Sequence, residues 1–348
     1  MSGMKTKFAL TALIVLTFML FISCSKKEDD AYVMTVNGKI PVSKMGITLT
    51  QEYILADFSG IDSISPKRYH PDSVMVKVIP YLDSLKQHNV ATFIDGTPDF
   101  MGRDPELVRE ISKRTGLNII IPTGWYSANN GKYLPHEIAE MNARQIADIW
   151  IDEFRNGIGN SGIKPGYIKL TLNDMPMSET DRKLTEAAAI THLNTGMPIL
   201  SYIGYTDGVL AQLNVLKENG VDPSAFIWGH ALVEPKVDHL YTATENGVWL
   251  VFDGISENYA VIDRAEQLLR HFKKVNGLSH IMVSGNAGWY QPGKPNGGDF
   301  RHYTAMFDTF LPILTLDEMT SEELGKLMIN NPSEAFSIKV KPFAEKRK

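Results

Sequence analysis

Short apolar runs alternate with amphipathic stretches along most of the chain, and this alternation is the main structural signal in the sequence. In segment 72–88, Val74, Val78 and Leu82 recur at helical spacing, which predicts a helix with one buried face. Apolar runs such as 90–95 are too short for helices and are typical of buried strands. Eight strand-like runs are predicted, at 46–57, 90–95, 117–122, 166–171, 197–203, 225–230, 248–253 and 280–286.

Helical stretches follow most of these runs, and capping residues mark several of their ends. Pro105 is well placed as a first helical residue, and Gly116 closes the same helix. Ser178 begins another helix, with acidic residues behind it, and Gly196 ends that helix. Helices are predicted over 72–88, 105–115, 135–155, 178–195, 207–219, 235–246, 258–276, 300–311 and 321–328.

Strict alternation of strands with helices predicts parallel strands joined by right-handed crossovers. Eight such units close as an α/β fold of the (β/α)8 TIM-barrel type more readily than as an open sheet. A doubly wound sheet is the alternative, but no Gly-x-Gly-x-x-Gly follows the first strand. We therefore predict a single barrel domain over 36–340. The Gly- and Pro-rich stretch 288–298 is predicted to be a loop at the end of the barrel where such enzymes keep their sites.

The N-terminal segment is predicted to be a secretory signal. Two lysines precede the apolar run 8–22, which is too short for a membrane span. Residues 20–24 resemble a bacterial lipobox, which implies that Cys24, the only cysteine, is lipidated. The alternatives are a cleaved signal with an unmodified Cys24 and an uncleaved anchor. We predict a lipoprotein signal peptide over 1–23, a polar tether over 24–35 and a frayed tail over 341–348.

Composition and charge narrow the choice of partners. The chain has 348 residues, 43% of them hydrophobic and 22% charged, which suits a globular domain with a sizeable core. Its net charge is −5 and it has no basic block, which argues against a nucleic-acid partner. We expect a protein anchored by lipid in a bacterial cell envelope, on the periplasmic or surface face of the outer membrane. Its expected partners are the membrane, through Cys24, and a small-molecule or glycan ligand.

Several motifs, in order and spacing, resemble the phosphotriesterase family of the amidohydrolase superfamily. The first predicted strand carries Gln51-Glu52-Tyr53 after Gly-x-Thr-Leu-x, where the family has His-Glu-His. The likeness extends over about 36–336. Further matching segments are Asp95-Gly-Thr-Pro, Gly102-Arg-Asp-Pro105, Thr115–Ile120, Thr123–Tyr126, Ile168-Lys169, Ala187–Ala189, Thr195–Pro198, Gly229-His230 and Val283-Ser284.

This resemblance implies a metallo-dependent-hydrolase barrel, in which two divalent metals share a carbamylated lysine and a hydroxide that attacks the substrate. Lys169 and His230 match two of the six ligand positions and keep the family's residue types. The other four positions are substituted, and they hold Gln51, Tyr53, Tyr202 and Asn286. We predict that all six side chains converge in one pocket at the strand C-terminal ends.

The substitutions favour a site without metal. Zinc prefers imidazole, thiolate or carboxylate ligands, whereas amide carbonyls are neutral and a phenol has a pKa of about 10. Without metals the carbamate has no support, so Lys169 is expected to be a plain amine. We therefore expect no cofactor. The alternatives are one divalent metal such as zinc at the degenerate site, or a ferric ion held by two tyrosinates and His230.

Two functions follow as hypotheses. The first is a metal-free pseudoenzyme or ligand-binding barrel. The second is an active hydrolase of esters, lactones or phosphotriesters, or a lyase, with a remodelled metal-free or single-metal site. In the second, Lys169 acts as an acid, base or Schiff-base amine and His230 assists. In the first, Lys169 is a structural amine bonded to Tyr53 or Tyr202, and His230 is a hydrogen-bonded core histidine.

Other candidate residues lie at predicted strand ends and in loops. Asp95 and Asp253 are candidate acids, or they hold loops in place. Trp125 and Trp289 are predicted to line the mouth and bind ligand, together with their neighbours Tyr126 and Tyr290. The alternative for these aromatic residues is loop packing.

Overall fold

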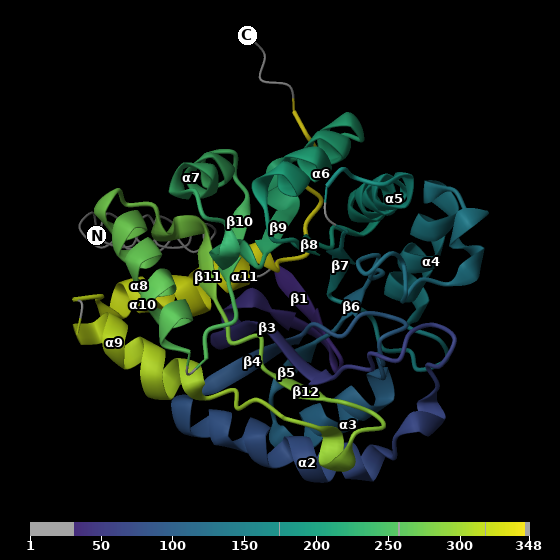
Figure 1. The fold of residues 1–348 in the computed structure, drawn as a ribbon, viewed down its shortest axis with the longest axis horizontal. Helices are drawn as coiled ribbons and strands as arrows, with labels where there is room; N and C mark the ends of the chain where they lie inside the picture. The colour runs from purple at the N-terminus through teal and green to yellow at the C-terminus, as the bar shows by residue number, and fades with distance from the viewer. Residues whose placement is uncertain (1–30, 174, 257, 317, 345–348) are drawn as a thin grey trace, which may run out of the picture.

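A computed structural model describes residues 31–173, 175–256, 258–316 and 318–344. Its parallel strands form a closed ring surrounded by helices (Figure 1). One arc has the order β11-β10-β9-β8-β7-β6 and the other β12-β3-β4-β5. The strands are β3 (Ile47–Leu55), β4 (Val90–Asp95), β5 (Asn118–Ile120), β6 (Pro122–Thr123), β7 (Tyr167–Thr171), β8 (Ile199–Tyr202), β9 (Phe226–Gly229), β10 (Trp249–Phe252), β11 (Ile281–Val283) and β12 (Gly288–Tyr290).

The two arcs join at both ends, which closes the barrel. On one side β5 and β6 are separated only by Ile121, so they are two halves of one barrel strand. On the other side the Asn286 N–H donates to the Gln51 carbonyl, and the Tyr53 N–H donates to the Ala287 carbonyl. The predicted (β/α)8 fold is confirmed. Residues 288–290, predicted to lie in a loop, instead form β12, because they pair with β3.

Helices pack around the ring, and local sequence sets their ends. Gly116 follows α3 with a φ of 76°, a left-handed conformation that favours glycine. Ser178 and Asp181 form a capping box at the start of α5. The helices are α2 (Pro71–Ser84), α3 (Pro105–Thr115), α4 (Ala143–Asn156), α5 (Glu179–Thr195), α6 (Thr206–Glu218), α7 (Val237–Glu245), α8 (Tyr259–Lys274), α9 (Leu311–Leu316), α10 (Ser321–Gly325) and α11 (Asn331–Ala335). Within the described ranges, no helix has the length and apolar character needed to cross a membrane.

The helix predicted over 135–155 is interrupted. A short 3-10 turn, His136–Ala139, comes first, and α4 starts only after Asn142. The Asn142 side chain accepts from the Gln145 N–H, and the Gln145 side chain returns a bond to the Asn142 N–H. This capping box begins a new helix, which explains the break.

An N-terminal hairpin closes the bottom of the barrel. Strands β1 (Tyr32–Thr35) and β2 (Gly38–Pro41) pair antiparallel, and β1 lies across the ring in Figure 1. Val33 is buried with the residues that fill the barrel interior, and Met34 lies against Gly166, just before β7 begins. The prediction of a tether over 24–35 is therefore wrong for 32–35, because this segment is a buried strand. The signal peptide and Cys24 lie outside the described residues.

The C-terminal segment is partly fixed to the barrel. The Asp222 N–H donates to the Lys341 carbonyl, and the Phe343 N–H donates to the Gly220 carbonyl. The Lys341 N–H donates to Nε2 of the buried His192. The predicted frayed tail is thus wrong for 341–343, since backbone bonds hold these residues against the barrel. Residues 345–348 are outside the described part.

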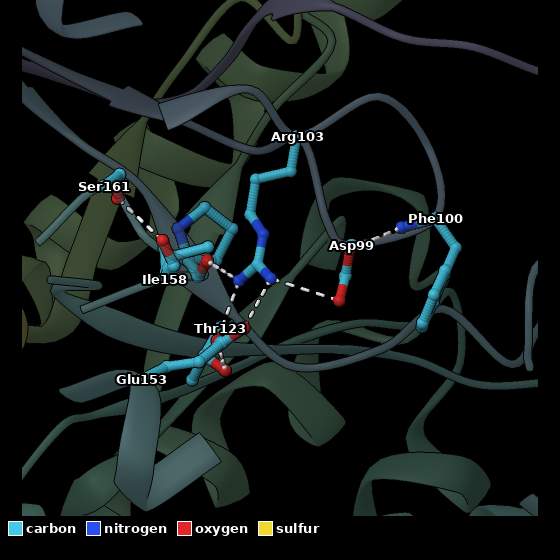
Figure 2. A network of polar contacts seen from close by, with 8 residues as sticks. Asp99, Phe100, Arg103, Thr123, Glu153, Ile158 and Ser161 are labelled. Atoms are coloured by element: carbon cyan, nitrogen blue, oxygen red, sulfur yellow. Dashed lines mark hydrogen bonds and ion pairs between the residues drawn. The ribbon is translucent and has the colours of Figure 1, made fainter. Parts of the chain in front are cut away.

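A buried arginine ties the loop after β4 to the neighbouring strand and helix (Figure 2). Arg103 donates through both terminal nitrogens to the Glu153 carboxylate on α4, at 2.9 and 2.6 Å. It also donates to the Pro122 carbonyl on β6 and forms an ion pair with Asp99. Thr123 donates its hydroxyl to Glu153. The network fixes the outer wall of this part of the barrel.

Candidate functional site

Strand β3 brings Gln51 into the barrel interior. The β3–β4 pairing shifts register between Leu49 and Glu52, so the strand bulges next to Gln51. A Cβ placed on Gly229 of β9 would lie 3.3 Å from the Gln51 side-chain oxygen, which shows that the amide reaches across the ring. Gln51 is buried, and neither its amide oxygen nor its amide nitrogen has a hydrogen-bond partner among the described residues.

Lys169 and Tyr53 form a buried pair. Lys169, on β7, is 1% exposed, and its Nζ donates to the Tyr53 hydroxyl at 2.7 Å. Burial lowers the pKa of Lys169 to about 7, although the charges of Asp95 and Asp253 oppose the shift. Burial also raises the pKa of the Tyr53 phenol, so it stays protonated. A Cβ on Gly96 would lie 2.7 Å from Nζ, so only glycine leaves room for this pair.

A second group lies across the pocket. His230 Nδ1 is 2.8 Å from Asp253 Oδ1 and 3.0 Å from the Tyr202 hydroxyl, and the His230 and Tyr202 rings stack at 4.6 Å. Burial by itself lowers the pKa of His230, but the hydrogen bond and charge of Asp253 outweigh it and raise the pKa above its ordinary value. Asn286 donates through Nδ2 to the Tyr202 hydroxyl at 3.0 Å and to Asp253 Oδ2 at 3.1 Å.

The structure therefore links five of the six side chains predicted to converge, and Gln51 lies beside Gly229, the chain neighbour of His230. Lys169 links the two groups, since its Nζ lies 4.6 Å from the Tyr53 ring centroid and 5.8 Å from that of Tyr202. Asp253 belongs to the same network as the partner of His230 and Asn286. Asp95 instead accepts bonds from the Ile54 and Thr97 N–H groups, so it holds the loop after β4.

Glu52 is a functional residue that the sequence reasoning missed. Its Oε1 accepts from the Gly285 N–H at 2.6 Å and the Ser284 hydroxyl at 2.8 Å, and its Oε2 accepts from the Ala287 N–H at 2.6 Å. These bonds fix the turn that carries Asn286, whose φ is 48°. Burial raises the pKa of Glu52 to about 7, although the three hydrogen bonds oppose the shift. The available signal was an acidic residue inside an otherwise buried strand.

Only part of the predicted aromatic mouth lies at the pocket. The Trp289 ring meets Tyr53 edge-on at 5.5 Å, and the Arg301 guanidinium lies 5.1 Å from its centroid. Trp125 is 3% exposed and packs edge-on against Trp150 of α4, so its contacts are those of core packing.

The neighbouring tyrosines also differ from each other. The charge of an ionised Tyr126 would raise the pKa values of both Tyr53 and Tyr202, so Tyr126 lies near the pocket. Tyr290 instead faces Gly297, where an added Cβ would lie 2.3 Å from its ring. Tyr290 thus packs against the loop that follows β12.

The residues present do not fit the two-metal centre that the resemblance implies. The Lys169 amine is hydrogen-bonded to a phenol, and Nδ1 of the single imidazole, His230, is shared by Asp253 and Tyr202. In the part of the chain that the structure describes, no group of three or more His, Cys, Asp or Glu side chains is placed to hold a metal ion. Two divalent ions need several anionic or imidazole ligands, which this donor set lacks.

The closed ring of eight strand–helix units, with polar side chains gathered where its strands end, defines a (β/α)8 TIM barrel. The chain belongs to the phosphotriesterase family, whose model matches residues 31–336. It is 26% identical to the phosphotriesterase homology protein of Escherichia coli K12, covering 84% of this chain and 98% of that protein. It is also 26% identical to a phospho-furanose lactonase of Mycoplasmopsis synoviae, covering 92% of this chain and 94% of that protein. A mutant organophosphorus hydrolase from Deinococcus radiodurans shares the fold, with a TM-score of 0.79 at 23% identity over 89% of this chain and 98% of that chain.

Proposed function

We propose that this phosphotriesterase-family barrel binds a small polar ligand and does not carry out metal-dependent hydrolysis. The observation that carries the proposal is the 2.7 Å hydrogen bond from Lys169 Nζ to the Tyr53 hydroxyl. In the family the matching lysine is a carbamate shared by two metals. Here Lys169 Nζ faces the Tyr53 phenol, which stands at a substituted ligand position and is a poor metal ligand while it stays protonated.

The pocket offers unused hydrogen-bonding capacity to a ligand. Both amide atoms of Gln51, the Asn286 Oδ1 and the Thr171 hydroxyl are buried without partners among the described residues. Leaving a buried polar atom unpaired costs about 1–3 kcal/mol, so a bound molecule that pairs with several of them gains affinity. The set contains donors and acceptors, which suits a hydroxyl-rich small molecule or a glycan end.

Metal content tests the proposal. As purified, the protein should hold well under one zinc per chain and show negligible phosphotriesterase and lactonase activity, because too few anionic ligands are present. The measurement is elemental analysis together with activity assays in added zinc, manganese or cobalt. Two metals bound stoichiometrically at this pocket would overturn the proposal.

A designed variant provides the matched comparison. Combining Gln51→His, Tyr53→His, Tyr202→His and Asn286→Asp supplies imidazole and carboxylate at the substituted positions. We expect this variant to gain divalent-metal binding, since the barrel places these side chains together. Activity need not return with the metals, because neighbouring residues also tune a metal site. A folded variant that binds no metal would mean that the backbone of the pocket has itself changed.

A second candidate function is metal-free carbonyl chemistry at Lys169. It is favoured by the amine's burial and its pKa of about 7. An unprotonated amine attacks an aldehyde or ketone carbon, and loss of water leaves an imine. The lowered pKa makes the unprotonated form abundant above pH 7, where an ordinary lysine is still an ammonium.

Borohydride trapping tests this candidate. With a small aldehyde, hydride reduction of the imine should mark Lys169 ahead of surface lysines, with labelling that rises as pH increases through about 7. Peptide mass spectrometry reads the site, and Lys169→Met is the control that should lose the label. Uniform labelling of all lysines would contradict this candidate function and would indicate that Lys169 is a structural amine.

We also propose that the protein is anchored in a bacterial cell envelope through a lipid on Cys24. The support is the basic start, the short apolar run and the cysteine that follows it in the sequence. One acyl chain gives only marginal membrane binding, so stable anchoring requires more than one chain on the cysteine.

A further inference from the structure

A second pocket opens beside the central site, on the same end of the barrel. Its volume is about 460 Å³, and its walls include Ser256 and Asn258 before α8, Ala287 after β11, and Arg301. Ala287 directly follows Asn286, and Gly254 of the same pocket follows Asp253. Two residues of the central network are thus chain neighbours of residues that line this pocket.

Arg301 is an exposed residue whose backbone and side chain both have contacts with β12. Its backbone pairs with Gly288 through two hydrogen bonds of 3.1 Å, and its guanidinium lies 5.1 Å from the Trp289 ring centroid. No carboxylate forms an ion pair with it among the described residues. Stacking on an aromatic ring restricts a guanidinium and leaves its N–H edge free to donate. Arg301 therefore presents a preorganised fork of donors.

Other features of the pocket also suit an anion. Asn258 caps the N-terminus of α8, a helix of 16 residues whose dipole places partial positive charge at that end. The indole Nε1 of Trp289, the ring that Arg301 lies over, is buried and without a partner in the described structure. Asn286 differs from these donors, because its unpaired Oδ1 is an acceptor. Asn286 is 6% exposed, so this oxygen needs a donor from the ligand.

The charge of Arg301 also reaches the central site. Burial raises the pKa of the Tyr202 hydroxyl, Asp253 adds to the rise, and the positive charge of Arg301 opposes it. A molecule with one end at Arg301 therefore has its other end close to the network of Tyr202 and Asn286.

We propose that the Arg301 pocket binds an oxyanion, either a carboxylate or a phosphate, on a ligand whose hydroxyl or amide donor reaches Asn286. This rests on the proposed binding function of the central pocket and adds the chemical class of the ligand. The guanidinium donates to the two oxygens of such a group through a forked pair of hydrogen bonds.

Anion titration at constant ionic strength tests the proposal. Phosphate and acetate are titrated separately into the full folded chain, with binding read from Trp fluorescence and thermal stability. We expect saturable binding of at least one anion, and at least about a tenfold weaker affinity in Arg301→Gln, because a charge-assisted pair is lost. Stronger binding of phosphate than acetate assigns a phosphoryl ligand, and the reverse order assigns a carboxylate.

Arg155→Gln is the matched control, because Arg155 is exposed on α4 and the variant loses the same charge. Its affinity should equal that of the wild type. Equal losses in both variants, an unchanged affinity in Arg301→Gln or the absence of saturable binding would overturn the Arg301 site. Metal analysis of the same samples separates the two ideas: a zinc-loaded protein refutes the proposed function, whereas a metal-free protein whose anion binding ignores Arg301 refutes only this inference.

Discussion

At the scale of the residue, Glu52 acts on the candidate site indirectly, by holding the turn that carries Asn286. Its carboxylate accepts bonds from both sides of the turn at Ser284–Ala287, and that turn sets the position of Asn286. Because Glu52 is fully buried, its ionisation is costly, and its pKa rises to about 7 from an ordinary value of 4.5. The turn and its asparagine thus depend on a group that titrates near neutral pH.

This shift predicts a pH-dependent stability difference between the wild type and Glu52→Gln. A folded-state pKa above the unfolded value gives stability that is fully present below about pH 4.5 and is lost as pH rises through about 7. The wild type should therefore lose up to about 3 kcal/mol relative to Glu52→Gln between pH 4.5 and 8. Urea unfolding at several pH values measures the difference.

The exposed Glu137 provides the control. Glu137→Gln makes the same chemical change away from the barrel interior, so its difference from the wild type over the same pH range is the baseline. A difference for Glu52→Gln that does not vary with pH beyond this baseline would contradict the assigned ionisation.

Sequence reasoning found side chains better than it found their partners. Tyr202 and Asn286 were singled out by the resemblance to the family's ligand positions at strand ends, and the structure joins them by a hydrogen bond. The Asp253–His230 bond was not foreseen, because it joins two different strands and depends on side-chain direction. Trp125 was expected at the mouth, since composition alone does not separate a pocket wall from the packing of Trp125 on Trp150.

At the scale of the element, the Arg103 network shows how a loop, a strand and a helix are joined. Arg103 contributes the only positive charge drawn in Figure 2, where it faces the carboxylates of Asp99 and Glu153. Its side chain is 4% exposed, so these charges interact with little screening by water. Removing one partner of such a pair leaves an uncompensated charge in the interior.

Arg103→Met should destabilise the protein by about 3–5 kcal/mol, because the Glu153 carboxylate loses both of its forked bonds. The stability of Arg103→Lys should lie between those of the wild type and Arg103→Met, since lysine keeps the positive charge but cannot form the forked pair of hydrogen bonds. Urea unfolding provides the measurement. The control is Arg155→Met on the exposed side of α4, with an expected change within about 0.5 kcal/mol. An Arg103→Met variant as stable as this control would show that the network contributes no net stability.

Elements with local signals were predicted well, and elements that depend on distant partners were not. Strand β4 has the predicted bounds 90–95, and α3 lies between Pro105 and Gly116 as its end residues indicated. Strand β12 was missed because its glycine-rich sequence is typical of a loop, and only pairing with β3 makes it a strand. The β1 strand was missed because its polar neighbours are typical of a tether.

At the scale of the whole molecule, the proposed membrane attachment rests on the segment before the barrel. Cys24→Ala should release the protein from the membrane fraction or leave an unprocessed precursor, because the sulfur proposed to carry the lipid is removed. Fractionation and the mass of the N-terminal peptide measure the outcome. Unchanged fractionation of the variant, together with a wild-type peptide that carries no lipid mass, would count decisively against the anchor.

The position of the buried hairpin determines which end of the barrel the proposed anchor would join. Strand β1 begins at Tyr32, eight positions after Cys24, and a chain of that length spans at most about 28 Å. Because β1 lies under the ring, a short tether from the membrane would join the barrel at its closed base. With the proposed anchor in place, the open end would be on the side of the barrel away from the tether. A bulky or polymer-borne ligand would then reach this end from the surrounding fluid without passing between the protein and the membrane.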